Sequence, residues 1–466
     1  MDFVLRFFRL NDPYRLIALW LMLTLASLPL LIDLPAMTLQ ELKDVVLGEA
    51  MGDNLLYVEI IDRTAPMMAL MDSILNFCFG RSLLARHILA LILICFQTSY
   101  FGILLINNKA YNETSYIPSL VFGFLCFFSF DLLTVSPELF ASTLLLLALN
   151  NLFKEIEFRV DRDSIVLNLG VFLGLASLFI FSYTIFLVGA ILILILFARA
   201  SLRKILLVLF GYGLVHAGLF TLYYCYEHTT DLWRHFYAAN FSRATLTHMD
   251  TNSLLVLIAV PGVYFIFSLF MLTREARFTK YQSQLFQTIF LWLAIALIQF
   301  WLMAEKTPHS LYIVVPAVAY FVSHYLLLIR RKWIAEMMFW LFMLGLLSLN
   351  YGSRYGWMKQ VNYESLFPQP SIYEKAVNGK SIMVIGNDLS LYQNHTLAGY
   401  FLDWDLSRKY FEEPDYYENI VKINEAIEKN PPDVIIDEVG LMGPIISRIP
   451  LLEKEYEKDS SIYRRH

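Results

Sequence analysis

Stretches of about 17 to 25 predominantly apolar residues recur between residues 15 and 350 of this chain. Inside a bilayer every backbone polar group must find its partner within the protein, so such stretches fold as membrane-spanning helices. The sequence therefore predicts an all-α, polytopic membrane protein. We predict about eleven spans, over residues 15–33, 83–107, 117–133, 138–153, 165–181, 184–198, 204–224, 254–272, 285–303, 311–329 and 333–350.

The composition agrees with this fold class. Of the 466 residues, 58% are apolar and 17% are charged, and the mean hydropathy is +0.55, more than the core of a water-soluble domain requires. The net charge of -5 forms no basic stripe, so nucleic acid is not an expected partner. No convincing cleavage site follows the first apolar run, which we interpret as an uncleaved anchor. Among the four cysteines, a disulfide between Cys78 and Cys225 stays open.

Lys and Arg gather in alternate loops, which predicts the side of the membrane on which each loop lies. If the protein lies in the inner membrane, the excess of Lys and Arg in cytoplasmic loops places its N-terminus in the cytoplasm. The loop of residues 34–82, the loop of residues 225–253, the turn "AEKTPHS" and the chain after Asn350 are then external, or periplasmic.

The composition changes near Arg354. "KSIMVIGND" and "PDVIIDEVG" are typical of short buried strands, and "DYYENIVKINEAIEKN" has the apolar spacing of an amphipathic helix. We therefore predict a membrane domain over residues 1–353 and a small periplasmic α/β domain over residues 354–466. Gly386 stands alone, and a phosphate-binding loop needs several glycines, so we favour a packing or substrate-covering role over nucleotide binding.

The first external loop, residues 34–82, is long enough to suggest a function. "TLQELKDVVLGEAMGD" begins with Thr38 and has Glu41 three residues later, the pattern of a helix capping box. "PMMALMDSILNFCFG" predicts a second amphipathic helix from Pro66 to Gly80. The polar bend "YVEIIDRTAPM" joins the two.

These stretches resemble the C-type membrane glycosyltransferases, the GT-C superfamily, which includes protein O-mannosyltransferases and aminoarabinose transferases. Further stretches that resemble the family are "SPELFASTLLLLALNN" (136–151) and "EKTPHSLYIVVPAVAY" (305–320), and the order of the motifs matches over most of residues 10–330. In the first loop the matching residues are Glu41, Gly52, Tyr57, Glu59, Asp62, Pro66, Phe79 and Gly80, and Arg86 follows inside the next span.

The resemblance implies transfer of a sugar from a dolichyl- or undecaprenyl-phosphate donor, reached through the membrane lipid. The acceptor would be an envelope glycan, lipid or protein on the external face. No further cofactor is implied, and the need for a divalent cation stays open. Such a transfer uses a carboxylate as general base and cations to stabilise the leaving phosphate.

The family's Asp-Glu pair aligns with Gln40-Glu41 in this chain. The base is then Glu41, with Asp62 or Asp44 as alternatives, or the chain is a degenerate relative without activity. Each acid also has a structural interpretation. Glu41 could cap its helix, and Asp44 could face water. Glu59 and Asp62 could form a local ion pair with Arg63 in a solvated turn.

Candidate substrate-binding residues lie on several external segments. Arg86 would pair with Glu41 or Asp62 or bind the donor phosphate, because a buried charge in a span needs a partner. Lys306 and His309 stand where a lipid phosphate would lie, with ordinary interfacial positions as the alternative. The full set is Tyr57, Glu59, Arg63, Arg86, Arg234, Arg243, Lys306 and His309.

A metal site is not expected, and two alternatives to an enzyme remain. The histidines of the 225–253 loop lack a zinc-binding spacing, so no metal site is predicted. A transporter or flippase for lipid-linked sugars would also have many spans, but internal repeats and mid-membrane acids are not evident. An inactive scaffold is the second alternative, and Gln40 is its best argument.

Overall fold

The computed structural model describes residues 4–52, 54–157, 162–241, 246–247, 249–275, 278–303, 305–375, 377 and 381–466. The chain divides into two compact units, each assembled from three separate stretches. The helical unit contains Met1–Pro35, Leu83–Leu219 and Ala244–Ser365, and the mixed unit contains Ala36–Ser82, Phe220–Arg243 and Leu366–His466. The C-terminal stretch therefore shares a unit with the first loop. A domain boundary after residue 353 stays a prediction.

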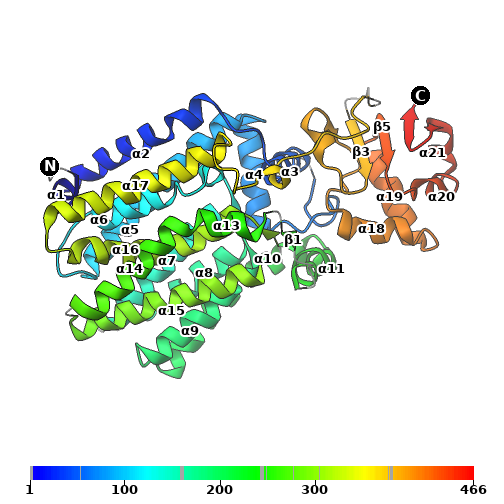
Figure 1. The fold of residues 1–466 in the computed structure, drawn as a ribbon. Helices are drawn as coiled ribbons and strands as arrows, with labels where there is room; N and C mark the ends of the chain where they lie inside the picture. Colours follow the sequence, from blue (N-terminus) through cyan, green and yellow to red (C-terminus); the bar gives the residue numbers. More distant parts are fainter. Residues whose placement is uncertain are drawn as a thin grey trace. The chain divides into compact units, whose positions relative to one another are not determined.

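The helical unit consists mainly of apolar helices (Figure 1). Helix α10 continues from this unit into the mixed unit. The helices are α1 (Val4–Phe8), α2 (Tyr14–Ile32), α5 (Leu83–Asn107), α6 (Ile117–Leu125), α7 (Pro137–Ile156), α8 (Asp163–Ser177), α9 (Ile185–Leu196), α10 (Leu202–Cys225), α13 (Thr251–Leu257), α14 (Ala259–Glu275), α15 (Lys280–Leu302), α16 (Val315–Leu328) and α17 (Lys332–Arg354). Short 3-10 turns are η1 (Phe130–Leu133), η2 (Phe181–Thr184), η4 (Pro308–Val314) and η5 (Glu364–Leu366), and β1 (Leu246–Thr247) pairs in parallel with β2 (Glu305–Lys306). The segments between α2 and α5 and between α10 and α13 belong largely to the mixed unit.

This is a multi-pass membrane protein. Within the described ranges, seven helices are long and apolar enough to cross a bilayer, or eight if the pair α13 and α14, bent by 56°, counts as one span. The predicted count of eleven is therefore not confirmed. The expected spans near residues 117–133, 165–181 and 184–198 are the shorter helices α6, α8 and α9, and 3-10 turns adjoin α6 and α9.

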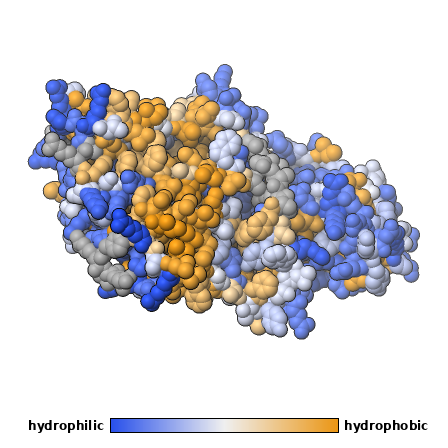
Figure 2. Space-filling model, turned by 90° about the horizontal axis from the view of Figure 1, so that it is seen from below, coloured by the Kyte–Doolittle hydropathy of each residue, from blue (hydrophilic) through white to orange (hydrophobic). Residues whose placement is uncertain are grey.

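The helices pack tightly against one another and expose apolar side chains on their outer faces. A Cβ added at Gly170 of α8 would lie 2.1 Å from the carbonyl oxygen of Val208 in α10, so the backbones of α8 and α10 are in close contact. On α10, Leu206, Phe210 and Leu214 are exposed. Figure 2 shows hydrophobic residues gathered over this unit, as expected of a lipid-facing surface.

In the mixed unit, the first loop contains the two predicted helices, α3 (Leu39–Ala50) and α4 (Pro66–Phe79). The capping box at Thr38 and Glu41 is present, and Gly80 ends α4 with φ +58°. The helices pack against each other closely enough that a Cβ at Gly48 would meet the carbonyl oxygen of Asp72 at 2.5 Å. The stretch from residue 220 to 243 adds α11 (Thr229–Leu232), the π-helical turn η3 (Trp233–Ala238) and α12 (Ala239–Phe241).

The C-terminal stretch forms a five-stranded sheet of order β4-β3-β5-β7-β6. β3 is parallel to β4 and β5, and β7 is antiparallel to β5 and β6. The predicted strands are β3 (Ser381–Ile385) and β5 (Val434–Asp437), and the predicted helix is α19 (Tyr417–Lys429). The other elements are η6 (Ser390–Gln393), β4 (Thr396–Leu397), α18 (Trp404–Glu412), α20 (Met442–Ile446), α21 (Pro450–Glu455), β6 (Tyr456–Asp459) and β7 (Ile462–Arg465).

The first loop contributes a residue to the core beside this sheet. Ile61 is fully buried in the same hydrophobic cluster as Met383, Ile385 and Phe401. Its backbone N–H donates to the carbonyl of Tyr400 at 3.0 Å, and its carbonyl accepts from the N–H of Asp403 at 3.1 Å. The bend and the C-terminal sheet therefore fold as one structure.

Candidate functional site

The first acid of the candidate site, Glu41, is fixed by its own helix. One carboxylate oxygen accepts hydrogen bonds from the N–H of Thr38 at 2.8 Å and from the hydroxyl of Thr38 at 3.0 Å. The side chain is 4% exposed. The capping interpretation of Glu41 is thus confirmed, and these bonds also hold the carboxylate in a defined position.

Two further buried acids lie in the same loop. Asp44 follows Glu41 by one turn of α3 and accepts from the amide of Gln40 at 2.8 Å, so it does not face water as the alternative interpretation supposed. Asp62, fully buried, accepts from the N–H of Thr64 at 2.6 Å and lies 3.0 Å from the ammonium of Lys43. Lys43, which the sequence reasoning missed, holds Asp62 beside the start of α3.

The local ion pair expected among Glu59, Asp62 and Arg63 does not occur among the described residues, so that prediction is wrong. The guanidinium of Arg63 instead makes a bidentate pair with Asp403 and a further contact with Asp405 at 3.1 Å, while Glu59 pairs with Lys429. Burial alone would raise the pKa of Asp403, but its hydrogen bonds with Arg63 and the charge of Lys43 lower it. The C-terminal stretch, distant in sequence, therefore supplies the partners of the bend.

Tyr57 is buried inside the mixed unit. Its φ of +70° is unusual for a residue with a side chain, and its hydroxyl donates to the carbonyl of Thr64 at 2.6 Å. The ring lies between Tyr223 and Phe236. Burial raises the pKa of Tyr57, and the nearby Tyr223 raises it further. Tyr57 thus holds the bend in shape from within.

His235, one of the histidines of the 225–253 loop considered from the sequence, connects three segments of the mixed unit. Because a carbonyl only accepts, Nδ1–H donates to the carbonyl of Tyr57 at 2.9 Å, and Nε2 accepts from the hydroxyl of Tyr410 at 3.2 Å. Burial, together with the positive charge of Lys422, lowers the pKa of His235 to about 4. The histidine is therefore neutral at pH 7.

In the helical unit, a polar cluster surrounds His309. Nε2 of His309 lies 3.5 Å from a carboxylate oxygen of Asp131, and Glu138 interacts with the same histidine electrostatically. Asp131 also accepts from Ser129, whose hydroxyl lies 2.8 Å from that of Tyr363. An isolated acid in an apolar run, "FDLL", is the signal that could have identified Asp131.

The other predicted cations differ in their surroundings. Lys306 lies over the ring of Trp301 at 4.7 Å, an exposed cation–π contact. Arg86, in the first turn of α5, is 2% exposed. Arg234 is exposed, and Arg243 lies outside the described residues. Their contact with a phosphate stays a prediction.

We searched the described part of the chain for metal-binding groups and disulfides. It contains no group of three or more His, Cys, Asp or Glu residues placed to hold a metal ion. Cys78 and Cys225 are both free and exposed. The open disulfide is therefore not formed in this structure.

The profile of a family described as "Family of unknown function (DUF6427)" matches residues 64–356. No curated protein matches the chain. Among solved structures, ArnT from Cupriavidus metallidurans bound to undecaprenyl phosphate is 10% identical with a TM-score of 0.53, covering 94% of this chain and 88% of that chain. The apo state of the same enzyme gives 10% identity and a TM-score of 0.55, over 82% of this chain and 85% of that one.

An oligosaccharyltransferase from Archaeoglobus fulgidus, tethered to an acceptor peptide, is also similar. It is 9% identical with a TM-score of 0.50, covering 97% of this chain and 74% of that chain. Such identities show the fold alone. The resemblance to the GT-C fold is thereby confirmed.

Proposed function

We propose that this chain, which belongs to the DUF6427 family, a family of unknown function, is a membrane glycosyltransferase that uses a polyprenyl-phosphate-linked sugar. The acceptor would be a glycan, lipid or protein of the cell envelope. One observation carries the proposal: a GT-C fold over 94% of the chain with buried carboxylates in its first loop. ArnT, of the same fold, binds undecaprenyl phosphate.

In the proposed reaction, an acceptor hydroxyl attacks the anomeric carbon of the donor sugar. The bond from that carbon to the phosphate oxygen breaks, the polyprenyl phosphate leaves, and the hydroxyl proton passes to a carboxylate. Glu41 is our first candidate for this base and Asp44 the second. Asp62, paired with Lys43, would position the loop. Arg63, held by Asp403, would do the same.

The departing phosphate needs positive charge or hydrogen-bond donors. Arg86, Lys306 and His309 are the candidates, and Asp131 would fix the orientation of the His309 ring. Tyr57 and Glu59 would stabilise the conformation of the bend that faces the substrate. Arg234 and Arg243 would contact the donor or the acceptor.

We further propose an inner-membrane location with the N-terminus in the cytoplasm and the mixed unit in the periplasm. The Lys- and Arg-rich loops support this orientation. Helices α6, α8 and α9 would then complete eleven crossings together with the eight long or bent spans.

The test separates the charge of Glu41 from its capping role. Glu41→Gln keeps the capping box, because this same chain builds one with glutamine at Thr279 and Gln282 of α15. A deletion strain carrying wild type, Glu41→Gln or Asp44→Asn at matched expression is compared by mass spectrometry of envelope glycans and glycoproteins. The proposal expects a sugar that disappears on deletion, returns with wild type and with Asp44→Asn, and stays absent with Glu41→Gln.

Other outcomes are equally informative. Full restoration by Glu41→Gln but not by Asp44→Asn would move the base to Asp44. If deletion alters no glycan while the purified protein still binds lipid-linked sugar, the enzyme proposal fails. The chain is then better explained as a scaffold or transporter, because Gln40, which donates to Asp44, replaces the family's Asp.

A further inference from the structure

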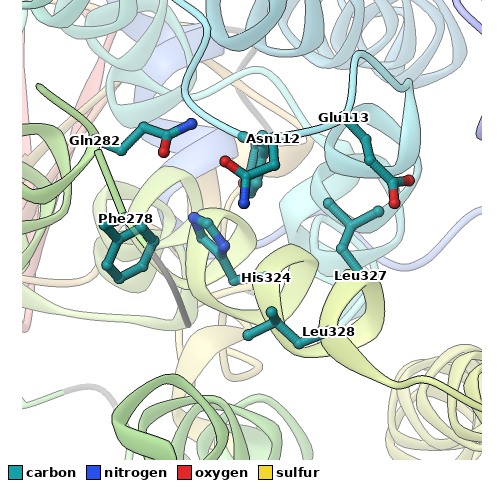
Figure 3. Close-up of a pocket in the computed structure, with 8 residues that line it drawn as sticks. Asn112, Glu113, Phe278, Gln282, His324, Leu327 and Leu328 are labelled. Atoms are coloured by element: carbon teal, nitrogen blue, oxygen red, sulfur yellow. The ribbon is translucent and has the colours of Figure 1, made fainter. Parts of the chain in front are cut away.

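The helical unit contains a polar cavity remote in sequence from the proposed acids. Its volume is about 100 Å³, against roughly 30 Å³ for one water in the liquid. It lies where α16 ends, α15 begins and the loop after α5 passes. Figure 3 shows the His324 imidazole facing the space between Gln282 and Asn112, with Phe278 to one side.

His324 is the feature that marks this cavity as a binding site. The side chain is 6% exposed, and its Nε2 makes no hydrogen bond within the described part of the chain. A buried polar atom without a partner costs about 1–3 kcal/mol. A guest that donates a hydrogen bond to Nε2 would remove this cost.

The lining selects for a positively charged donor. Glu113 carries the negative charge of the lining, Asn112 and Gln282 present amides, and no Lys or Arg is among the described lining residues. The rings of Tyr111 and Phe278 lie 4.3 Å and 5.5 Å from the His324 ring, as ring centroids. Aromatic faces with carboxylate and imidazole acceptors suit an ammonium group.

A second hollow of about 40 Å³ is lined by three cations, Arg6, Arg9 and Lys332, and by one acid, Glu336, which accepts from the N–H groups of Val4 and Leu5. Arg9 connects the two, because its Nε lies 2.8 Å from the Glu113 carboxylate and its Nη2 lies 3.5 Å from the carbonyl of Leu327. The positive charge of Arg6, Arg9 and Lys332 exceeds the negative charge of Glu336, which favours a phosphate in the second hollow. The Arg9–Glu113 ion pair stands between the two hollows.

The location favours a lipid over a water-soluble guest. The half-buried side chains of Leu327 and Leu328 line the cavity. The helix ends around it adjoin Lys109, Lys280 and Arg330, so the cavity lies at the level of the headgroups on the Lys- and Arg-rich side. We propose that it binds the zwitterionic headgroup of a phosphatidylethanolamine, with the ammonium at His324 and the phosphate at Arg9.

The full-length protein in detergent, supplied with phosphatidylethanolamine, phosphatidylcholine or phosphatidylglycerol of matched acyl chains, tests this site by native mass spectrometry. We expect phosphatidylethanolamine to bind about tenfold more tightly than phosphatidylcholine, which has no N–H to donate to His324. This factor corresponds to one charge-assisted hydrogen bond.

His324→Leu should abolish the preference. His216→Leu, which alters a histidine of α10 bonded to Ser177, is the matched control and should keep it. If His324→Leu does not fold, Asn112→Trp decides, because Asn112 is exposed and a larger side chain there blocks the cavity. Equal binding of the three lipids, tighter binding of phosphatidylglycerol, or an unchanged preference in Asn112→Trp would overturn the proposal.

Discussion

The Arg63–Asp403 pair is the residue contact on which the shape of the first loop most depends. Both side chains are 8% exposed, and they come from segments 340 residues apart. Removing one partner of a buried pair leaves the other charge unpaired, at a cost of about 3–5 kcal/mol.

We therefore expect Asp403→Asn to lower the free energy of unfolding of the mixed unit by about 3 kcal/mol, measured by urea denaturation. Glu412→Gln is the control, because it breaks the exposed Arg408–Glu412 pair of the same helix, α18, and should cost less than about 1 kcal/mol. Equal effects of the two substitutions would contradict the assignment.

His235 gives the mixed unit a specific dependence on pH. Folding lowers its pKa from 6.5 to about 4, so the unfolded chain binds a proton more readily than the folded one. Above pH 6.5 both states are neutral and the effect vanishes. Stability is lost as the pH falls from 6.5 towards 4, by about 3 kcal/mol in total.

Denaturation of wild type and His235→Asn at pH 7.5 and pH 5 measures this loss. Asparagine keeps a donor for the carbonyl of Tyr57 and does not titrate, so the variant should lose less stability on acidification. The difference between the two proteins isolates His235 from the other groups that titrate there. Parallel losses would show that His235 is not responsible.

Among the elements, α3 carries the proposed base, and its first turn fixes that base. Thr38→Ala removes the hydroxyl that accepts from the N–H of Glu41 and donates to its carboxylate. We expect a loss of about 1 kcal/mol and faster amide hydrogen exchange in the first turn of α3. Thr279→Ala, at the capping box of α15, should leave exchange in α3 unchanged. Unaltered exchange in Thr38→Ala would show that the capping box does not stabilise the first turn of α3.

Elements set by local signals were predictable from the sequence. The capping box of α3, the proline that begins α4 and the apolar strands β3 and β5 depend on neighbours within a few residues. The broken spans were not predictable, because 3-10 turns such as η1 and η2 follow from packing between helices, which hydropathy does not report.

In the candidate site, too, residues marked by local patterns were predictable, and residues that depend on distant segments were not. Glu41, Asp44 and Asp62 were identified because a family pattern and helix spacing marked them. Lys43 and Asp131 were missed, and the partners of His235 were not predicted, because each of these residues acquires its partner only when distant segments meet. The same holds for Asp403, whose sequence surroundings resemble any helix N-cap.

At the scale of the whole molecule, the mixed unit unites loops of the membrane part with the C-terminal stretch. Ile61 packs in the hydrophobic cluster beside the sheet. Lys429 pairs with Glu59 of the bend, and Asp403 pairs with Arg63. The C-terminal stretch is therefore part of the support for the proposed acids. The bend should lose its order when that stretch is absent.

A protein ending at Ser365 tests this dependence. It lacks Asp403, Met383 and Phe401, so Arg63 becomes unpaired and Ile61 loses its core. We expect trypsin to cleave after Arg63 at least about tenfold faster than in the full chain, because cleavage follows the population of the open form. Cleavage after Arg330, exposed in the helical unit, provides the internal control and should keep its rate. If peptide mass spectrometry finds unchanged cleavage after Arg63, the first loop holds its structure without the C-terminal stretch.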